Sequence, residues 1–284
     1  MSLLRGFPWS HKNLDFKGYS VAGQSTSLMF SNAKICFDIA QGFPFNLNAK
    51  LYCLTHLHAD HGSGLNYVLS QRSLFRLPQA NIMLPAENID SVNIILTEWM
   101  KIEGFEYDYK LIPVDENTLF DFSAKYQVRA FPTTHRVSSF GYIVYEKKKK
   151  LKSEFQNVSR QDIINAKQNN ITIEEEVLNP IIAFTGDTQI EFIKAHPDIT
   201  RAQVLFMECT YLDDKKSLEE TRKWGHLHFD EFVNSIDEFK NEHISLIHLS
   251  ARYSTPQSEK IIGSQLPHNY KEKVSIFPRP PMSQ

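Results

Sequence analysis

The most informative feature of the sequence is a short run of side chains that can bind metal ions. It places three imidazoles and one carboxylate within the six residues His56-Leu57-His58-Ala59-Asp60-His61. Neutral imidazole nitrogens and carboxylate oxygens are the common ligands of Zn²⁺ and similar divalent ions. The alternative is a cluster of buried histidines or a chance metal site, and the tight spacing of four such groups argues against it. The run therefore predicts a divalent metal site.

The residues on either side indicate where this site lies in the fold. Residues 50–54 before it are short, mostly apolar and bounded, which is typical of a buried strand. After it, Gly62 and Gly64 precede an apolar spacing from Leu65 to Leu74 that predicts a helix. The run is thus expected on a loop at the carboxyl end of a strand, where α/β proteins usually carry their chemistry.

Three further candidates also follow predicted strands. His135 follows a strand at 127–131, Asp187 follows one at 181–185, and His248 ends one at 244–248. Taken singly, Asp187 could be a turn or capping residue, and each histidine could belong to the core. A binuclear site, however, needs a bridging carboxylate and at least one histidine beyond the first loop. Their shared position at strand ends predicts that they complete such a site.

The remaining pattern predicts a layered α/β protein in one domain, residues 1–284. Helical spacing is expected at 86–101, 190–195, 218–224 and 231–240. Further strands are expected at 19–21, 27–30, 34–38, 82–84, 110–114, 140–145 and 203–207. Residues from about 146 to 179 differ, because they open with a lysine run, pass through a polar stretch and end in three glutamates. We expect this segment to be an insertion that leaves the core, with a short helix after Ser159.

Bulk composition sets limits on partners and location. The 284 residues are 42% hydrophobic and 23% charged, which is ordinary for a globular protein with a full core. A formal net charge of −2 gives no general attraction to nucleic acid, so any basic surface must be local.

The three cysteines bear on the cellular location. Cys36, Cys53 and Cys209 form no CxxC pair and lie in apolar segments, which predicts buried free thiols and a reducing compartment. No apolar run approaches the roughly 20 residues of a membrane span, and the first residues lack a signal-peptide core. We expect a soluble cytoplasmic protein, with an organelle as the alternative.

The pattern His-Xaa-His-Xaa-Asp-His resembles the signature of the metallo-β-lactamase superfamily of binuclear metal hydrolases. Other segments resemble ribonuclease Z, the tRNA 3′-processing endonuclease, and the lysine-rich insertion resembles its short form. The segments that carry this likeness are Ala183-Phe-Thr-Gly-Asp-Thr188, Met207-Glu208-Cys-Thr210, Gly225-His226-Leu-His228 and His248-Leu-Ser-Ala-Arg-Tyr253. The likeness runs from about Gly18 to Tyr253 and implies an αββα sandwich, two packed mixed sheets with helices outside. A long Gly-Pro-rich arm and a Pro-Xaa-Lys-Xaa-Arg-Asn loop of that family are absent, and Met207 and Cys209 replace its His and Ala.

The resemblance also assigns roles to the candidate residues. One metal would be held by His56, His58 and His135, the other by Asp60, His61 and His248, with Asp187 bridging the two. Asp38 would support the metal loop through hydrogen bonds. Asp60 would orient the attacking water, and His226, polarised by Glu208, would protonate the leaving group; His228 is a structural residue or an alternative donor. The roles of Arg252 and Tyr253 stay open. Two Zn²⁺ ions are expected, with Mn²⁺ or Fe²⁺ as alternatives.

The function implied is an endoribonuclease that removes 3′ trailers from precursor tRNA. The products would be a tRNA with a 3′-hydroxyl and a trailer with a 5′-phosphate. Two alternatives remain: a small-molecule phosphodiesterase, lactonase or thioesterase on the same metals, and a non-enzymatic RNA-binding protein, which the full ligand set argues against. The resemblance implies a homodimer, and no membrane partner is expected. The lysine run is either a solvated loop or a set of tRNA contacts formed by Lys147, Lys148, Lys149, Lys150 and Lys152.

Overall fold

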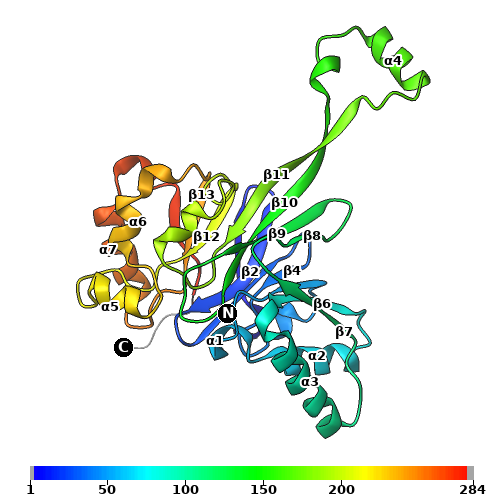
Figure 1. The fold of residues 1–284 in the computed structure, drawn as a ribbon. Coiled ribbons are helices and arrows are strands. Elements are labelled where there is room, and N and C mark those ends of the chain that lie inside the picture. Colours follow the sequence, from blue (N-terminus) through cyan, green and yellow to red (C-terminus); the bar gives the residue numbers. More distant parts are fainter. Residues whose placement is uncertain (1–2, 280–284) are drawn as a thin grey trace.

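Two seven-stranded sheets pack against each other, with helices on their outer faces (Figure 1). The computed structural model describes residues 3–279. The first sheet contains, in spatial order, β1 (Phe7–His11), β2 (Leu14–Val21), β3 (Ser25–Phe30), β4 (Ile35–Phe37), β5 (Leu51–Cys53), β6 (Ala80–Pro85) and β7 (Tyr109–Val114). The second contains β14 (Val274–Ile276), β13 (His243–Ile247), β12 (Val204–Glu208), β11 (Glu174–Phe184), β10 (Phe140–Leu151), β9 (Tyr126–Pro132) and β8 (Leu119–Asp121). The α-helices are α1 (Ala59–Gly62), α2 (Leu65–Leu74), α3 (Ile89–Glu103), α4 (Arg160–Gln168), α5 (Leu218–Lys223), α6 (Phe229–Asn234) and α7 (Thr255–Gln265). The predicted αββα sandwich is confirmed.

The two sheets have the same internal order. In each, the first three pairings along the chain are antiparallel and the last three are parallel, so the fourth strand, β4 or β11, takes part in both. The carboxyl ends of parallel strands meet at one edge of a sheet, and β5, β11, β12 and β13 all belong to such parallel sets. The loops that follow these strands therefore converge at the edge where the candidate site was expected.

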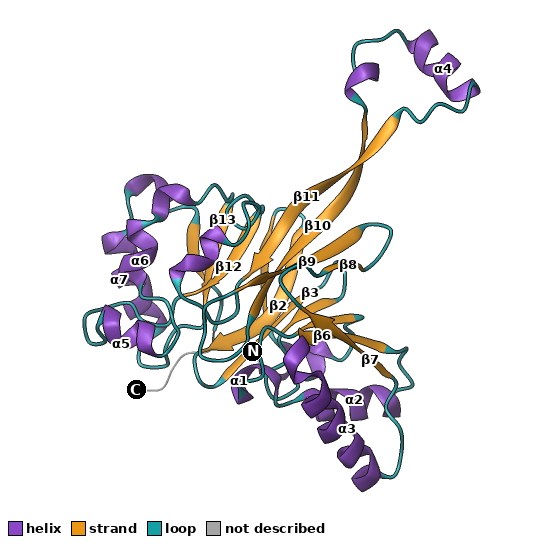
Figure 2. Cartoon of the chain, in the orientation of Figure 1, coloured by secondary structure: helices purple, strands orange, loops and turns teal. Residues whose placement is uncertain are grey.

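The core lies between the sheets and under the helices. Phe37 of the first sheet stacks on Phe184 of the second with ring centroids 4.9 Å apart. Along β5, Leu51 and Cys53 belong to this central cluster, whereas Tyr52 between them packs in the cluster under α2 and α3. Successive side chains of a strand point to opposite faces, so one short strand holds two layers together. Helices α5, α6 and α7 lie on the other outer side, over the second sheet (Figure 2).

The lysine-rich segment is an arm rather than a loop. Strands β10 and β11 continue beyond the sheet as a two-stranded ribbon and carry α4 at its far end (Figure 1). Lys147, Lys148, Lys149 and Lys150 lie within β10 and Lys152 directly follows it, so the alternative of a solvated loop is wrong. Lys149 and Lys150 face Glu176 and Glu175 across the ribbon, and opposite charges at facing positions favour strand pairing. The helix expected after Ser159 is confirmed, because the Ser159 hydroxyl caps the first turn of α4 by accepting the Asp162 N–H. We call residues 146–179 the arm.

Other predictions differ in detail. The sequence does not predict strands β1, β8 and β14 or helices α1 and α7. Helix α1 contains Asp60 and His61, which the sequence places on a loop. The helix expected at 190–195 is a 3₁₀ helix, Ile190–Lys194, and the one expected at 231–240 is divided into α6 and a 3₁₀ turn, Ile236–Glu238. All three cysteines are free and buried, as predicted. Within residues 3–279, none of the helices is long and apolar enough to cross a membrane.

Candidate metal centre

The structure brings together all seven side chains that were predicted as metal ligands. They follow four different strands: His56, His58, Asp60 and His61 come after β5, His135 after β9, Asp187 after β11 and His248 after β13. Their ligand atoms fall into groups whose members lie within 4.8 Å of one another and could hold a metal ion. Most of these side chains are buried, with His56 and His61 fully so. Residues far apart in the sequence thus form one cluster of ligand atoms.

One part of this cluster has the dimensions of a four-coordinate metal cage. His58 Nδ1 lies 3.0 Å from His56 Nε2 and 3.2 Å from His135 Nε2. Asp187 Oδ2 lies 3.8 Å from His56 Nε2 and 3.9 Å from His135 Nε2. A tetrahedral Zn²⁺ with bonds of about 2.0–2.1 Å places its ligand atoms about 3.3 Å apart. These four atoms, which we call the first cage, fit that geometry, although the carboxylate oxygen lies slightly farther from the histidine nitrogens than the about 3.3 Å of an ideal site.

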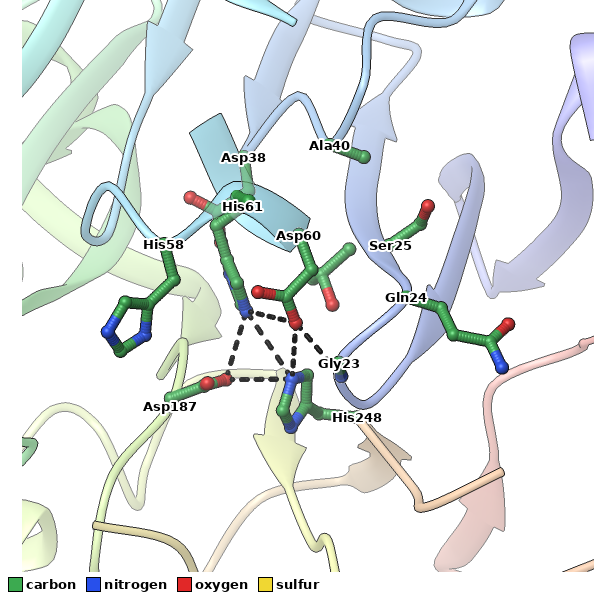
Figure 3. Close-up of polar contacts among 12 residues, drawn as sticks. Gly23, Gln24, Ser25, Asp38, Ala40, His58, Asp60, His61, Asp187 and His248 are labelled. Atoms are coloured by element: carbon green, nitrogen blue, oxygen red, sulfur yellow. Dashed lines mark hydrogen bonds and ion pairs between the residues drawn. The ribbon is translucent and has the colours of Figure 1, made fainter. Parts of the chain in front are cut away.

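A second cage lies on the other side of Asp187 (Figure 3). Asp187 Oδ1 is 3.3 Å from both His61 Nε2 and His248 Nε2. Those two nitrogens are 3.4 Å apart, and Asp60 Oδ2 lies 3.4 Å from His248 Nε2 and 3.6 Å from His61 Nε2. Asp187 thus offers one carboxylate oxygen to each cage. That is the arrangement expected of a carboxylate that bridges two metal ions.

Hydrogen bonds on the outer side of the imidazoles determine which nitrogen faces the cages. His135 Nδ1 lies 2.8 Å from the Gly225 carbonyl oxygen, which can only accept, so the nitrogen donates. His61 Nδ1 lies 2.8 Å from Asp38 Oδ2 and donates in the same way. In a neutral imidazole the other nitrogen then carries a lone pair, and in both residues this is the Nε2 that points into a cage. Partners of this kind are typical of metal-bound histidines.

Two threonines act in the same way for two further histidines. Thr55 Oγ1 donates to Asp38 and lies 3.0 Å from His56 Nδ1, so that nitrogen is the donor. Thr210 Oγ1 donates to a buried carboxylate, that of Glu208, and lies 3.1 Å from His248 Nδ1. Both histidines therefore direct the lone pair of Nε2 inward. Four Nε2 lone pairs converge on two small spaces, which fits cations rather than further hydrogen bonds.

The charges inside the cages support the same conclusion. Asp187 Oδ1 is buried and has no hydrogen-bond donor, which is costly for a carboxylate oxygen unless a cation satisfies it. Burial lowers the pKa of His56, His58 and His135, so these rings are neutral, as metal ligands must be. Burial also acts on His61, but the carboxylates of Asp187 and Asp38 outweigh it and raise its pKa well above the usual value. These carboxylates therefore favour a positive charge between them, which a divalent ion would supply. The donor set fits two divalent metal ions.

Asp38 lies behind the metal loop, as the resemblance implied. It is fully buried and accepts hydrogen bonds from the Thr55 N–H at 2.7 Å and from His61. Its φ of +50° and the φ of +55° at His248 are both left-handed, which costs about 1–3 kcal/mol for a residue other than glycine. The His248 N–H donates to the Ser20 hydroxyl at 2.9 Å and so joins the two sheets at this strained residue. The backbone therefore stores strain at two positions that support the cages.

His226 and Glu208 form a pair beside the cages. His226 Nδ1 lies 3.0 Å from Glu208 Oε1, so Nε2 is the nitrogen left for a ligand in the cleft. Burial lowers the pKa of His226, but the Glu208 carboxylate raises it more, to about 9. Glu208 itself is fully buried and accepts hydrogen bonds from the Thr188 N–H and the Thr210 hydroxyl. Glu208 therefore orients His226 and does not reach the cleft.

The cleft over the cages has a volume of about 400 Å³ and is lined by His58, Asp60, His135, Asp187, His226 and His248, among others. His228 is not among its lining residues; it is buried and caps the first turn of α6. The Tyr253 hydroxyl donates to Asp213 at 2.8 Å, and the Arg252 guanidinium lies 5.0 Å from the ring centre of Tyr211. The structure thus gives His228 and Tyr253 supporting positions.

Sequence reasoning missed several residues of the cleft, among them Gly23, Arg136 and Trp224. The Gly23 N–H donates to Asp60 Oδ2 at 2.9 Å, although the sequence marked Gly23 only as a turn (Figure 3). Arg136 and Trp224 also line the cleft. The available signal was their position in the chain, because Arg136 follows the predicted ligand His135 and Trp224 lies two residues before His226.

Comparisons with solved structures identify the fold. The short form of human tRNase Z, ELAC1, aligns with a TM-score of 0.61 and 18% identity, covering 93% of this chain and 96% of that chain. The metallo-β-lactamase fold protein YhfI of Bacillus subtilis aligns with a TM-score of 0.62 and 12% identity, covering 97% of this chain and 98% of that chain. At such identities the likeness shows the fold alone, which is the metallo-β-lactamase fold.

Comparisons of sequence give the family. No family model matches the chain. The tRNase Z TRZ1 of Arabidopsis thaliana, however, is 34% identical over 253 residues, which cover 88% of this chain and 90% of that protein. The match therefore extends well beyond the metal-binding motifs and includes most of both proteins. On this identity and coverage, the chain belongs to the tRNase Z family.

Proposed function

We propose that this protein is a metal-dependent endoribonuclease that removes 3′ trailers from precursor tRNA. The observation that carries the proposal is the His226–Glu208 pair, which lies beside two metal cages in one cleft. Hydrolysis of a phosphodiester needs both a nucleophile and a proton for a poor leaving group, and this cleft offers a place for each. Membership of the tRNase Z family gives the substrate class.

The metal ions and Asp60 serve the attacking side of the reaction. Two divalent ions in these cages would supply a nucleophile at neutral pH and screen the charge of the phosphate oxygens. The Gly23 N–H holds Asp60, and although burial raises the pKa of Asp60, the neighbouring imidazoles of His248 and His61 outweigh burial and lower this pKa below its usual value. It therefore remains a carboxylate and can accept a hydrogen bond from the attacking water. This bond would fix the direction of attack.

His226 serves the leaving side. The ribose 3′-oxygen is a poor leaving group and needs a proton as its bond to phosphorus breaks. His226 Nε2 donates that proton, while Glu208 holds Nδ1 and favours the charged imidazolium. Proton donation of this kind contributes about 10²–10⁴-fold to a rate. The products would be a tRNA with a 3′-hydroxyl and a trailer with a 5′-phosphate.

Cleavage of a 3′-extended precursor tRNA tests this function. The metal-loaded protein is expected to cut at the base of the trailer, and a chelator is expected to stop it. An aryl phosphodiester assayed in parallel separates the metal chemistry from the choice of substrate. Hydrolysis of that small ester without any cleavage of precursor tRNA would contradict the proposal and favour a small-molecule hydrolase.

We propose Zn²⁺ as the metal in both cages. Five imidazole nitrogens, one oxygen of Asp60 and the two oxygens of Asp187 surround two four-coordinate spaces. This nitrogen-rich set suits Zn²⁺, whereas Mn²⁺ usually takes octahedral oxygen-rich sites. Elemental analysis of the protein purified without added metal tests this, and two equivalents of iron or manganese would contradict it.

The three buried free thiols suit a reducing compartment, so we propose a cytoplasmic location. Fractionation of cells that express a tagged chain tests this, and finding the chain in an organelle would overturn it.

We also propose that the arm contacts precursor tRNA. Lys147 is the least available of its lysines, because its ammonium group pairs with Asp121 and its side chain is only 13% exposed. Lys148, Lys149 and Lys150 are exposed, and Lys152 is partly exposed. Phosphate contacts by such side chains supply much of the affinity of proteins for RNA. A chain without excess positive charge needs a local basic surface of this kind.

Reversing two charges on the arm tests that contact. Lys148→Glu with Lys150→Glu is expected to raise KM for precursor tRNA by about 10-fold, because repulsion at a polyanion-binding surface mainly weakens association. The matched control is Lys110→Glu with Lys271→Glu, which makes the same change in net charge on exposed lysines outside the arm. Hydrolysis of an aryl phosphodiester should stay unchanged in both variants. An equal rise in KM for the control would contradict a role of the arm.

We further propose that a second copy of the chain covers the outer face of α2 and α3. Ile94, Ile95 and Ile102 of α3 are 62%, 60% and 73% exposed, and Leu74 and Phe75 at the end of α2 are 62% and 63% exposed. The two groups are neighbours, because Ser70 of α2 donates to the carboxylate of Glu103 in α3 at 3.1 Å. Contiguous exposed apolar side chains of this size usually mark an interface.

The mass of the protein in solution tests this interface. The wild type is expected to be a dimer, and Ile95→Asp with Ile102→Asp is expected to be a monomer, because burying two carboxylates opposes association. Leu119→Asp is the control, since this exposed apolar side chain on β8 lies outside the proposed face. A dimer that survives the double substitution would place the interface elsewhere.

A further inference from the structure

A large aromatic side chain stands exposed at the rim of the metal cleft. Trp224 directly follows α5 and is 49% exposed, although it is one of the largest apolar side chains. The Arg136 guanidinium lies 4.7 Å from the centre of its ring, and both residues line the cleft together with His226. An arginine that stacks on an exposed indole in this way holds the ring in place and adds positive charge beside it.

The position of this pair is fixed by the first cage. Gly225, the residue after Trp224, accepts the hydrogen bond from His135 Nδ1 at 2.8 Å, and Arg136 directly follows His135. Gly225 has a φ of +76°, and a Cβ at this position would lie 2.7 Å from His135 Nδ1. The turn therefore needs glycine and packs directly on a cage histidine. The indole, the guanidinium and His226 are thereby held at set positions relative to the reacting centre.

We infer that Trp224 and Arg136 form the stacking site for one nucleobase, that of the nucleotide whose 3′-oxygen leaves. This inference rests on the proposed function. His226 must lie next to that 3′-oxygen to protonate it, and the oxygen belongs to the last nucleotide kept on the tRNA. Trp224 is two residues from His226 on the same turn and shares its cleft, so the base of that nucleotide is within reach of the indole. Aromatic side chains stack on unpaired bases of every type. The site would thus place the scissile phosphate without restricting the base.

The experiment combines a change in the protein with a change in the RNA. Trp224→Leu removes the aromatic ring but keeps an apolar side chain, and Trp224→Phe keeps a ring. Each is assayed on precursor tRNA with a normal last nucleotide and on the same RNA with an abasic ribose at that position. Trp224→Leu is expected to raise KM on the normal substrate by about 10-fold, within the range of roughly 5- to 150-fold that one stacked base provides. Trp224→Phe is expected to retain most of the binding.

The combination of the two changes decides the matter. If the base stacks on Trp224, the abasic substrate should have a KM about 10-fold higher than the normal substrate for the wild type. For Trp224→Leu, the two substrates should have nearly the same KM. Independent effects that multiply, or an unchanged KM in Trp224→Leu with the normal substrate, would overturn the inference. Arg136→Met should weaken binding of the normal RNA more than Arg136→Lys does. Failure of the wild type to cleave any precursor tRNA would instead strike at the proposed function, so the two failures are distinguishable.

Discussion

Replacing His226 by alanine is expected to lower kcat on precursor tRNA by about 10²–10⁴-fold while both metal ions remain bound. His226 is not needed to complete either cage, so its loss should leave metal content unchanged. Its imidazole is the group in the cleft that Glu208 holds in the proton-donating form. Without it, the 3′-oxygen must leave unprotonated or take its proton from water.

The dependence on pH gives a second signature of this proton donor. The imidazolium exists below the pKa of His226, which Glu208 raises despite burial, so kcat is expected to fall as the pH rises past that value. Bound divalent cations would move this fall to lower pH, and the readout is therefore its presence in the wild type and its absence in His226→Ala. Single-turnover rates with metal-loaded protein provide the measurement.

His228 offers the matched control for His226. It lies two residues away, but it is buried at the start of α6 and takes part in a capping box. His228→Asn keeps a residue that can cap the helix and is expected to change kcat by less than about threefold. A larger loss in His228→Asn than in His226→Ala would exchange their roles and contradict the assignment made from Glu208.

The cluster of candidate metal ligands is predictable because its signals are local. The candidates lie in the segments that follow short apolar strands, and the topology brings the ends of those strands to one edge. The supporting network was not predictable in the same way. Thr55, Thr210 and Ser20 are ordinary polar residues in the sequence, and their roles depend on partners such as Asp38 and His248 in other strands. Only the folded chain specifies those pairs.

The errors in the predicted elements have physical causes. A run of like charges favours a solvated loop because the charges repel, yet glutamates across the ribbon face this run and allow a strand. Three-residue strands such as β8 and β14 are too short to show a period of two. Trp224 was passed over because an exposed aromatic leaves no periodic signal, and its place at the cleft follows from the turn at Gly225.

The second large effect is expected at Asp187, because it is the residue that both cages share. Its Oδ2 lies 3.8 Å from His56 Nε2 in the first cage, and its Oδ1 lies 3.3 Å from His248 Nε2 in the second. Asp187→Asn keeps the volume but removes the negative charge, and its amide would turn hydrogen atoms toward at least one cage. Metal content is expected to fall below two ions per chain. The kcat on precursor tRNA is expected to fall by at least about 10³-fold, since losing even one electrostatic contact to a transition state lowers kcat by about 10²–10³-fold.

Asp60→Asn separates this bridging role from simple ligation. Asp60 approaches His61 and His248 of the second cage, so its replacement is expected to weaken one metal site and leave the other filled. Titration of each variant with Zn²⁺, followed by calorimetry, gives the number and affinity of sites. If Asp187 bridges, Asp187→Asn must weaken both sites, whereas Asp60→Asn weakens one. A full complement of two tightly bound ions in Asp187→Asn would mean that the buried oxygen without a donor is satisfied by something other than metal, and the binuclear centre would have to be rebuilt from the histidines alone.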